Sequence, residues 1–162
     1  MTKIGKIVLA MVILVGIFIS PMAAEGEWSR EALQEIYLEA LREQGYRPDI
    51  DKDGDIQFMV LGSNYFIIID EKDSQFFQLY TGFWLDDATM EDTYELVNFA
   101  NRRSKVAKIS LSEKEDEPDK LIVSITAELL VNDPEDFSTL LTRAISLLAN
   151  ARSIFQAQLA KL

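Results

Sequence analysis

The chain has 162 residues, with 16 Lys and Arg, 27 Asp and Glu and no His, so its formal net charge is −11. This charge disfavours nucleic acid as a partner, because binding to phosphate backbones depends on Lys and Arg. Since the chain has neither His nor Cys, it lacks the usual general base, the thiol nucleophile and the soft metal ligands. The sequence therefore predicts a protein that is not an enzyme and has no zinc site.

The first 24 residues have the organisation of a secretory signal peptide. Lys3 and Lys6 precede an apolar run over 7–19, and the small residues of "SPMAA" follow. We predict cleavage after Ala24, although Met22 is larger than the residue normally found two positions earlier. The protein would then be periplasmic or secreted in the bacterial envelope. The alternative is an uncleaved N-terminal anchor formed by 7–19, a run shorter than the ~20 residues of a comfortable membrane span.

The remaining residues, 25–162, are enough for one domain with a single core. Removal of 1–24 takes away two lysines and no acid, so the net charge falls from −11 to −13. The absence of cysteine excludes a disulfide and a lipid attached to cysteine. The domain must therefore depend on its hydrophobic core for stability.

The first predicted element is a helix over 29–44. Ser29 is a suitable N-cap, and Trp28 and Leu33 have the spacing of a hydrophobic staple. Apolar residues then recur on one helical face until Gly45, which ends the helix.

Three β-rich runs follow the helix. Apolar and polar residues alternate over 56–60, and "YFIIID" at 65–70 and "QFFQLYTGFW" at 75–84 come next. The polar turns between them are "GSN" at 62–64 and "EKDS" at 71–74. These short runs predict an antiparallel meander.

Helical spacing returns over 86–104, where Thr89 or Asp87 is the expected N-cap. Alternating apolar residues then predict a hairpin of two strands, 107–111 and 121–129. The connector between them, "EKEDEPDK", is too charged to be buried.

A third helix is predicted over about 134–160. Asp133 is the expected cap, and Pro134 occupies the first helical position. The order α-β-β-β-α-β-β-α therefore predicts an α+β domain, in which three helices cover one face of a mainly antiparallel five-stranded sheet.

The chain resembles a known family in two stretches and in its terminal helix. The stretches are "LREQGYRPDIDKDGDIQFMVLGSNYFIII" and "ELVNFANRRSKVAKISL", and the second carries Asn98 and Asn101 just before a strand. Both are similar to the bacterial YbjN-type family of sensory transduction regulators. The resemblance implies a sandwich like that of type III secretion chaperones, often a homodimer, which acts by binding protein. The leader departs from this pattern, because such proteins work mainly in the cytoplasm.

The stretch "DIDKDGDIQFMV" opens like a calcium-binding loop, with Asp49, Asp51, Asp53 and Asp55 as candidate ligands. An EF-hand needs a bidentate Glu at its twelfth position, whereas this sequence has Val60 there. The same residues suit a helix-to-strand turn, in which the aspartates accept local hydrogen bonds and glycine takes a positive φ. We expect no cofactor, and a calcium site is the alternative.

Two acid pairs, Asp86/Asp87 and Asp133/Asp136, could flank a sugar bond in a hydrolase. Each pair has a simpler interpretation as a helix cap or as a partner of the helix dipole. Asn98 and Asn101 lie on one side of the second helix, where we expect them to bond the chain leading into the next strand rather than a ligand.

The residues that alternate with the core of the predicted sheet are also apolar. If Ile67 and Phe77 face the helices, a second apolar set faces the other way. This candidate interaction patch comprises Phe66, Ile68, Phe76, Tyr80 and Trp84. The alternative is that the first or last helix covers that face within the monomer.

The sequence thus predicts an exported, non-enzymatic protein-binding or chaperone-like module that acts through apolar sheet or helix surface. Its partner would be another protein or a second copy of the chain, and only the N-terminal segment would contact a membrane. The alternative is an envelope protein that binds calcium or a small ligand, and hydrolase activity is a remote third class.

Overall fold

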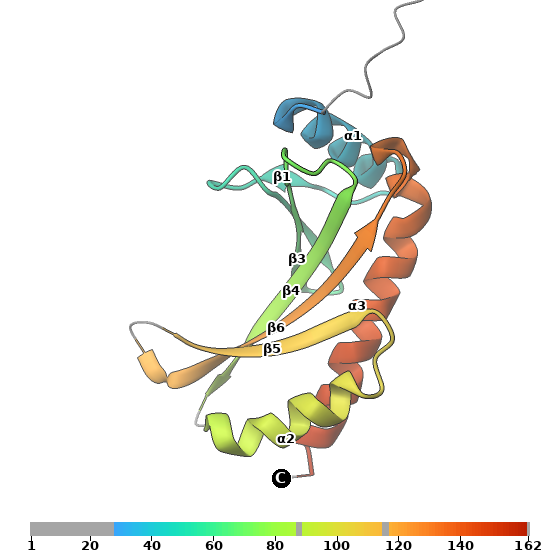
Figure 1. Ribbon diagram of the computed structural model, residues 1–162. Coiled ribbons are helices and arrows are strands. Elements are labelled where there is room, and N and C mark those ends of the chain that lie inside the picture. Colours follow the sequence, from blue (N-terminus) through green and yellow to red (C-terminus); the bar gives the residue numbers. More distant parts are fainter. Residues whose placement is uncertain (1–27, 87–88, 115–116, 162) are drawn as a thin grey trace, which may run out of the picture.

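The computed structural model describes residues 28–86, 89–114 and 117–161 (Figure 1). The strands form one antiparallel sheet in the order β1-β2-β3-β4-β6-β5. The elements are α1 (Arg30–Glu43), β1 (Asp49–Ile50), β2 (Ile56–Val60), β3 (Ser63–Ile68), β4 (Phe76–Asp86), α2 (Met90–Asn101), β5 (Ala107–Lys114), β6 (Glu117–Leu130), a 3₁₀ turn (Pro134–Asp136) and α3 (Phe137–Leu159). This arrangement confirms the predicted α+β class.

The predicted number of five strands is wrong, because Asp49 and Ile50 form a sixth, β1. Asp49 lies opposite Gln57 and Ile50 lies opposite Ile56. A strand of two residues is too short to show an alternating pattern. It forms because the turn over 51–55 returns the chain beside β2, where Asp51 N donates to Asp55 O at 2.9 Å.

The turn between β2 and β3 also differs from the prediction, because it consists of Leu61 and Gly62 rather than 62–64. Val60 lies opposite Ser63, so only two residues connect the strands. Both have positive φ, 48° for Leu61 and 79° for Gly62. Two such residues in succession are typical of a type I′ turn.

The hairpin of β5 and β6 is longer than predicted. Both strands continue into the charged connector, and Asp86 at the end of β4 pairs with Lys120 of β6. The charges of the connector predicted that this segment is not buried, but they did not predict that it continues the strands. The end of the hairpin extends away from α3 (Figure 1).

Lys120 of this hairpin forms an ion pair, because its Nζ atom lies 2.5 Å from Glu117 Oε2. This contact raises the pKa of Lys120.

The ends of α1 agree with the prediction. The Ser29 side chain accepts from Ala32 N at 3.2 Å, as an N-cap does. Gly45 follows the helix with φ of 84°. The start of the last helix is three residues later than predicted, because the turn that begins at Pro134 is 3₁₀ and α3 starts at Phe137. Such turns are frequent at helix N-termini.

All three α-helices within the described ranges pack on the same face of the sheet, and α3 crosses it (Figure 1). The aromatic centre of this core is Tyr37, whose ring centroid lies 4.5 Å from that of Phe137 and 6.2 Å from that of Phe77. Burial raises the pKa of Tyr37 to about 12. Completely buried side chains from the sheet and from the helices complete the core: Leu33, Leu41, Ile56, Ile67, Leu79, Ile125, Leu141, Leu148 and Phe155.

None of the helices in 28–86, 89–114 and 117–161 is long and apolar enough to cross a membrane. The predicted signal peptide, 1–24, and the alternative anchor, 7–19, lie outside the described residues.

Candidate functional site on the open face of the sheet

The second face of the sheet, opposite the helices, is called the open face below. Along β3 and β4 the buried residues Tyr65, Ile67, Phe77 and Leu79 alternate with partly exposed ones. The partly exposed set comprises Phe66, Ile68, Phe76, Tyr80 and Trp84, which are the predicted patch residues. The alternative that α1 or α3 covers this face is wrong, because both helices pack on the other side.

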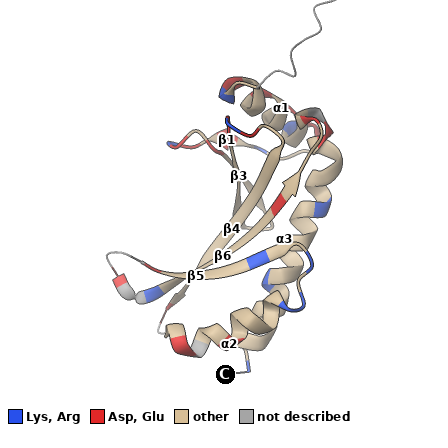
Figure 2. Cartoon of the chain, viewed as in Figure 1, with Lys and Arg blue, Asp and Glu red and all other residues tan. Residues whose placement is uncertain are grey.

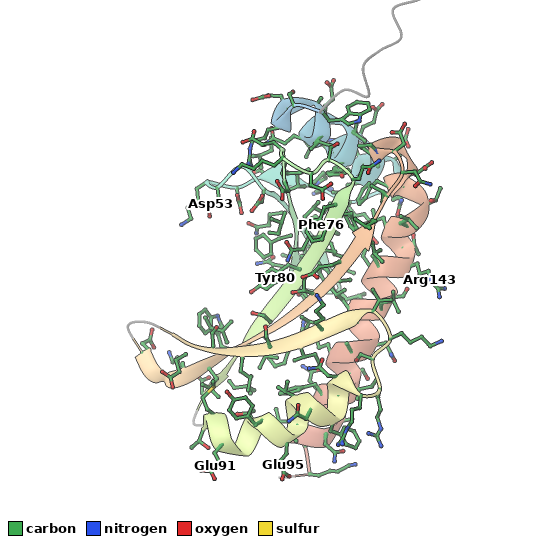
Figure 3. All side chains as sticks on the ribbon, in the orientation of Figure 1. Asp53, Phe76, Tyr80, Glu91, Glu95 and Arg143 are labelled. Atoms are coloured by element: carbon green, nitrogen blue, oxygen red, sulfur yellow. The ribbon has the colours of Figure 1, made fainter. Side chains whose placement is uncertain are left out.

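The centre of the open face is a pair of aromatic rings on neighbouring strands. Phe66 lies opposite Tyr80 in the sheet, and their ring centroids are 5.7 Å apart. A methyl group added at Gly82 would lie 2.6 Å from the Tyr80 hydroxyl oxygen. The Tyr80 ring therefore extends along β4 over Gly82. Figure 3 shows Phe76 and Tyr80 along β4, whereas Arg143 extends into solvent from α3.

Exposure varies along this face. Trp84 is 52% exposed, and Phe66, Ile68, Phe76 and Tyr80 are half-buried. Two strongly exposed apolar residues were not predicted: Met59, 62% exposed, and Leu130, 77% exposed. Leu130 lies opposite Phe76, and Met59 follows the buried Phe58 in β2. The period of two residues that assigned Phe66, Ile68, Phe76, Tyr80 and Trp84 to this face also assigns Met59 and Leu130 to it. These apolar residues share the open face with Gln57, Asn64 and Gln78, which lie opposite Phe66, Met59 and Ile68. The apolar residues together are called the apolar surface below.

The part of the open face formed by 108–112 of β5 and 124–128 of β6 is polar. Lys108 and Glu128 form an ion pair across these strands. Ser110 lies opposite Ser124, and Lys108 lies opposite Thr126. Charged residues gather elsewhere, on α1, on the loops and at the hairpin end, while most of the sheet is uncharged (Figure 2). The apolar surface is therefore bounded by polar and charged residues on one side, as in many protein interfaces.

The predicted calcium ligands hold their own turn together. Asp51 Oδ1 accepts from Asp53 N at 2.9 Å and from Asp55 N at 3.0 Å. Asp49 Oδ1 accepts from Ile50 N, and Asp55 Oδ1 accepts from Ile69 N. The bonds accepted by Asp49 and Asp51 are the local bonds expected of aspartates in a turn, whereas Asp55 joins the turn to Ile69 at the end of β3. Within the described residues, no group of three or more acidic side chains is arranged to hold a metal ion.

Two side chains of α1 fix the same turn from outside. Gln34 Nε2 donates to Gly54 O at 2.7 Å, and Arg30 donates to the backbone oxygens of Asp53 and Ile69. Gly54 has φ of 86°. A Cβ there would lie 2.9 Å from Arg30 Nη1, the end of a flexible side chain, so glycine is needed mainly for the backbone conformation. The turn is thus a structural connection between α1 and β2.

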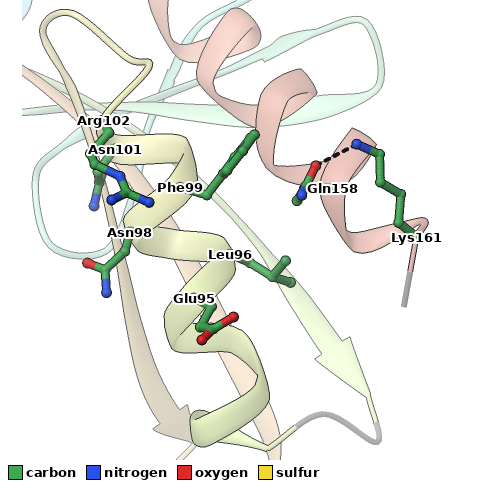
Figure 4. Close-up of a pocket in the computed structure, with 8 residues that line it drawn as sticks. All are labelled: Glu95, Leu96, Asn98, Phe99, Asn101, Arg102, Gln158 and Lys161. Atoms are coloured by element: carbon green, nitrogen blue, oxygen red, sulfur yellow. Dashed lines mark hydrogen bonds between the residues drawn. The ribbon is translucent and has the colours of Figure 1, made fainter.

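A groove of about 750 Å³ lies between α2 and the C-terminal end of α3 (Figure 4). It is lined by Glu95, Leu96, Asn98, Phe99, Asn101, Arg102, Gln158 and Lys161. Asn101 has the structural role that was predicted, since its Nδ2 donates to Ile109 O at 3.0 Å and its Oδ1 accepts from Ile109 N at 2.8 Å. Lys161 Nζ donates to Gln158 Oε1 at 2.7 Å. At least three polar side chains of the groove, those of Asn101, Gln158 and Lys161, therefore make intramolecular contacts.

The described residues of the two acid pairs lie at the ends of elements. Asp133 and Asp136 are exposed at the start of α3, where Asp136 N donates to Asp133 O at 3.0 Å. Asp86 is exposed at the end of β4, and its predicted partner Asp87 lies outside the described residues. The expectation that Asp133 caps the last helix is wrong, because the N-cap residue of α3 is Asp136, whose side chain makes no capping hydrogen bond.

The comparisons with known proteins agree with the resemblance noted in the sequence. Residues 34–154 match the YbjN family, described as "Putative bacterial sensory transduction regulator". No curated protein matches the chain. The fold is similar to a solved structure described as YbjN, "a putative transcription regulator from E. coli", with a TM-score of 0.61 and 12% identity over 80% of this chain and 93% of the other. Since the family match covers most of the sequence, the chain belongs to the YbjN family.

Proposed function

We propose that the chain is an exported, non-enzymatic binding module whose open face receives the apolar side chains of a protein partner. The observation that carries this proposal is the apolar surface around Phe66, Phe76 and Tyr80 on β3 and β4, the face of the sheet opposite the described helices. An antiparallel sheet whose second face meets only water normally carries polar residues there. An exposed apolar surface bounded by polar residues is typical of an interaction site. The family description as a regulator is compatible with such a role.

The charge of the chain favours a partner that combines apolar side chains with Lys or Arg. The net charge is −11 for the whole chain and −13 after the predicted cleavage. The lysines at the margins of the open face already have acidic partners, because Lys108 pairs with Glu128 and Lys120 pairs with Glu117. The acidic field would attract a cationic segment and repel an acidic one. Burial of apolar area would then supply most of the affinity.

A labelled peptide of alternating Leu and Lys tests this chemistry with the full-length chain. We expect an increase in fluorescence anisotropy with this peptide and none with a peptide of alternating Leu and Glu. The change Phe76→Gln should weaken binding about tenfold, because burial of a large apolar side chain supplies roughly 1.5–3 kcal/mol. Gln156→Ala is the matched control, since Gln156 is exposed on α3. Equal affinity for both peptides, or full affinity in Phe76→Gln, would contradict the proposal.

Light scattering distinguishes whether the open face binds a cationic protein segment or a second copy of the chain. We expect a monomer for the wild type and for Phe76→Gln. A wild-type dimer that dissociates in Phe76→Gln would make a second copy the occupant of the open face, and would thereby replace the cationic partner.

A further inference from the structure

The turn between β2 and β3 contains an unfavourable residue. Leu61 has φ of 48° and Gly62 has φ of 79°. The first central position of a type I′ turn favours Asn, Asp or Gly, because the left-handed region brings a Cβ too close to the backbone. Leucine therefore destabilises this turn relative to asparagine.

Packing against the rest of the described residues does not compensate for this cost. The Leu61 side chain is fully exposed, so it gains no burial in the described structure. A branched residue with positive φ is uncommon, and unfavourable backbone conformations occur often at functional sites. Leu61 is thus both conformationally unfavourable and unprotected from water.

The turn lies at one end of the open face, beside the end of β4. Arg152 of α3 contacts both strands there, because it donates to Ser63 Oγ and its guanidinium lies 4.9 Å from the centre of the Phe83 ring. Ser63 directly follows the turn, and Phe83 directly precedes Trp84. Met59 is 62% exposed two residues before Leu61, and Trp84 is 52% exposed. Three of the most exposed apolar side chains therefore lie at the same end of the sheet.

We infer that Leu61, with Met59 and Trp84 beside it, is the anchor by which the open face holds a cationic, apolar protein segment. Single exposed apolar residues are common and need no explanation. Here three of them lie at one end of the apolar surface, and one occupies a position that favours asparagine. On binding, Leu61 would bury its side chain in the partner, which it does not do within the chain. This inference rests on the proposed function.

Leu61→Asn tests the inference, because it removes the apolar side chain and improves the turn at once. In the full-length chain we expect the unfolding temperature to rise by about 3 °C. Affinity for the Leu and Lys peptide should fall about tenfold. Val106→Asn is the matched control: Val106 is also an exposed apolar residue, but it lies outside the open face, between α2 and β5. Leu61→Gly removes the same apolar side chain without adding an amide group. It should therefore weaken binding as much as Leu61→Asn does, which shows that the loss is not caused by the asparagine amide.

The fluorescence of Trp84 reports where the peptide binds. The chain has two tryptophans, Trp28 and Trp84, so the change Trp28→Phe leaves Trp84 as the single emitter. We expect its emission to shift to shorter wavelength with the peptide, and the shift to require a higher peptide concentration in Leu61→Asn. Failure of the wild type to bind would overturn the proposed function. Normal binding by Leu61→Asn, or a lower unfolding temperature, would overturn only the inference about the anchor.

Discussion

The Tyr80 hydroxyl oxygen lies 2.6 Å from the position that a Cβ at residue 82 would occupy, so the ring of Tyr80 depends on glycine two residues later in β4. Glycine normally weakens a strand, because it has no side chain to pack and loses more entropy on folding. Here the Tyr80 ring fills the space above it. The pair Tyr80–Gly82 therefore determines the shape of the open face at its centre.

Gly82→Ala should displace the Tyr80 ring and destabilise the fold by about 1–3 kcal/mol, the usual cost of an overpacked site. The same change in a Tyr80→Leu background should cost less, since the hydroxyl is absent. Urea unfolding of the wild type, the two single variants and the double variant gives the coupling between the two positions. An equal cost in both backgrounds would assign the effect instead to Val123 O, which lies 3.1 Å from the added Cβ.

The ends of α1 and much of the core could be predicted from the sequence because their signals are local. Ser29 and Gly45 bound α1 within one residue of the prediction. The alternation along β3 and β4 correctly separated the buried side chains from the five patch residues. Which face the helices cover could not be deduced, because both faces of these strands are apolar and a periodic pattern does not identify the packing partner.

The turn of Leu61 and Gly62 could not be predicted, because its conformation opposes the local preference of leucine. The polar letters "GSN" indicated a turn one residue later. The strand β1 was missed for a different reason: its two residues are held by the turn that precedes β2, and no periodicity is visible in so short a segment. In both cases the pairing of neighbouring strands decides what local propensity does not.

The side chain of Asn101 joins the end of α2 to the edge strand β5 through two hydrogen bonds to Ile109. Asn101→Ala should therefore lower the free energy of unfolding by about 1–3 kcal/mol, because it leaves two backbone groups without their partner. Asn98→Ala is the matched control, since Asn98 is exposed on the same helix, and its effect should stay within about 0.5 kcal/mol. Urea unfolding measures both. If the two variants were equally stable, the bonds to Ile109 would have no structural importance.

Asp51 tests whether the aspartate turn depends on calcium. Its Oδ1 atom accepts from two backbone amides. Asp51→Ala should thus destabilise the chain by about 1 kcal/mol. The loss should be the same in calcium as in a chelator. Asp49→Ala is a milder control, because Asp49 accepts only from the neighbouring Ile50 N. Calorimetric heat on addition of calcium that disappears in Asp51→Ala would instead support the calcium alternative.

Because the phenol of Tyr37 is buried, the free energy of unfolding should decrease at alkaline pH. Its pKa is raised from 10.0 to about 12 by burial, so the folded state keeps a proton that the unfolded state releases. The stabilisation is complete below pH 10 and is lost as the pH rises from 10 to about 12. By linkage the loss approaches about 2.7 kcal/mol. Tyr65 adds to this loss in the same direction, because burial also raises its pKa.

The change Tyr37→Phe isolates the Tyr37 contribution, because it keeps the ring that packs on Phe137 and Phe77 and removes the ionisable group. Urea unfolding at a series of pH values between 8 and 12 measures the stability of both proteins. We expect the wild type to lose more stability than Tyr37→Phe above pH 10, and the difference between them to be constant below it. Parallel curves over the whole range would show that Tyr37 ionises equally easily in the folded and unfolded chain, and would contradict its position at the centre of the core.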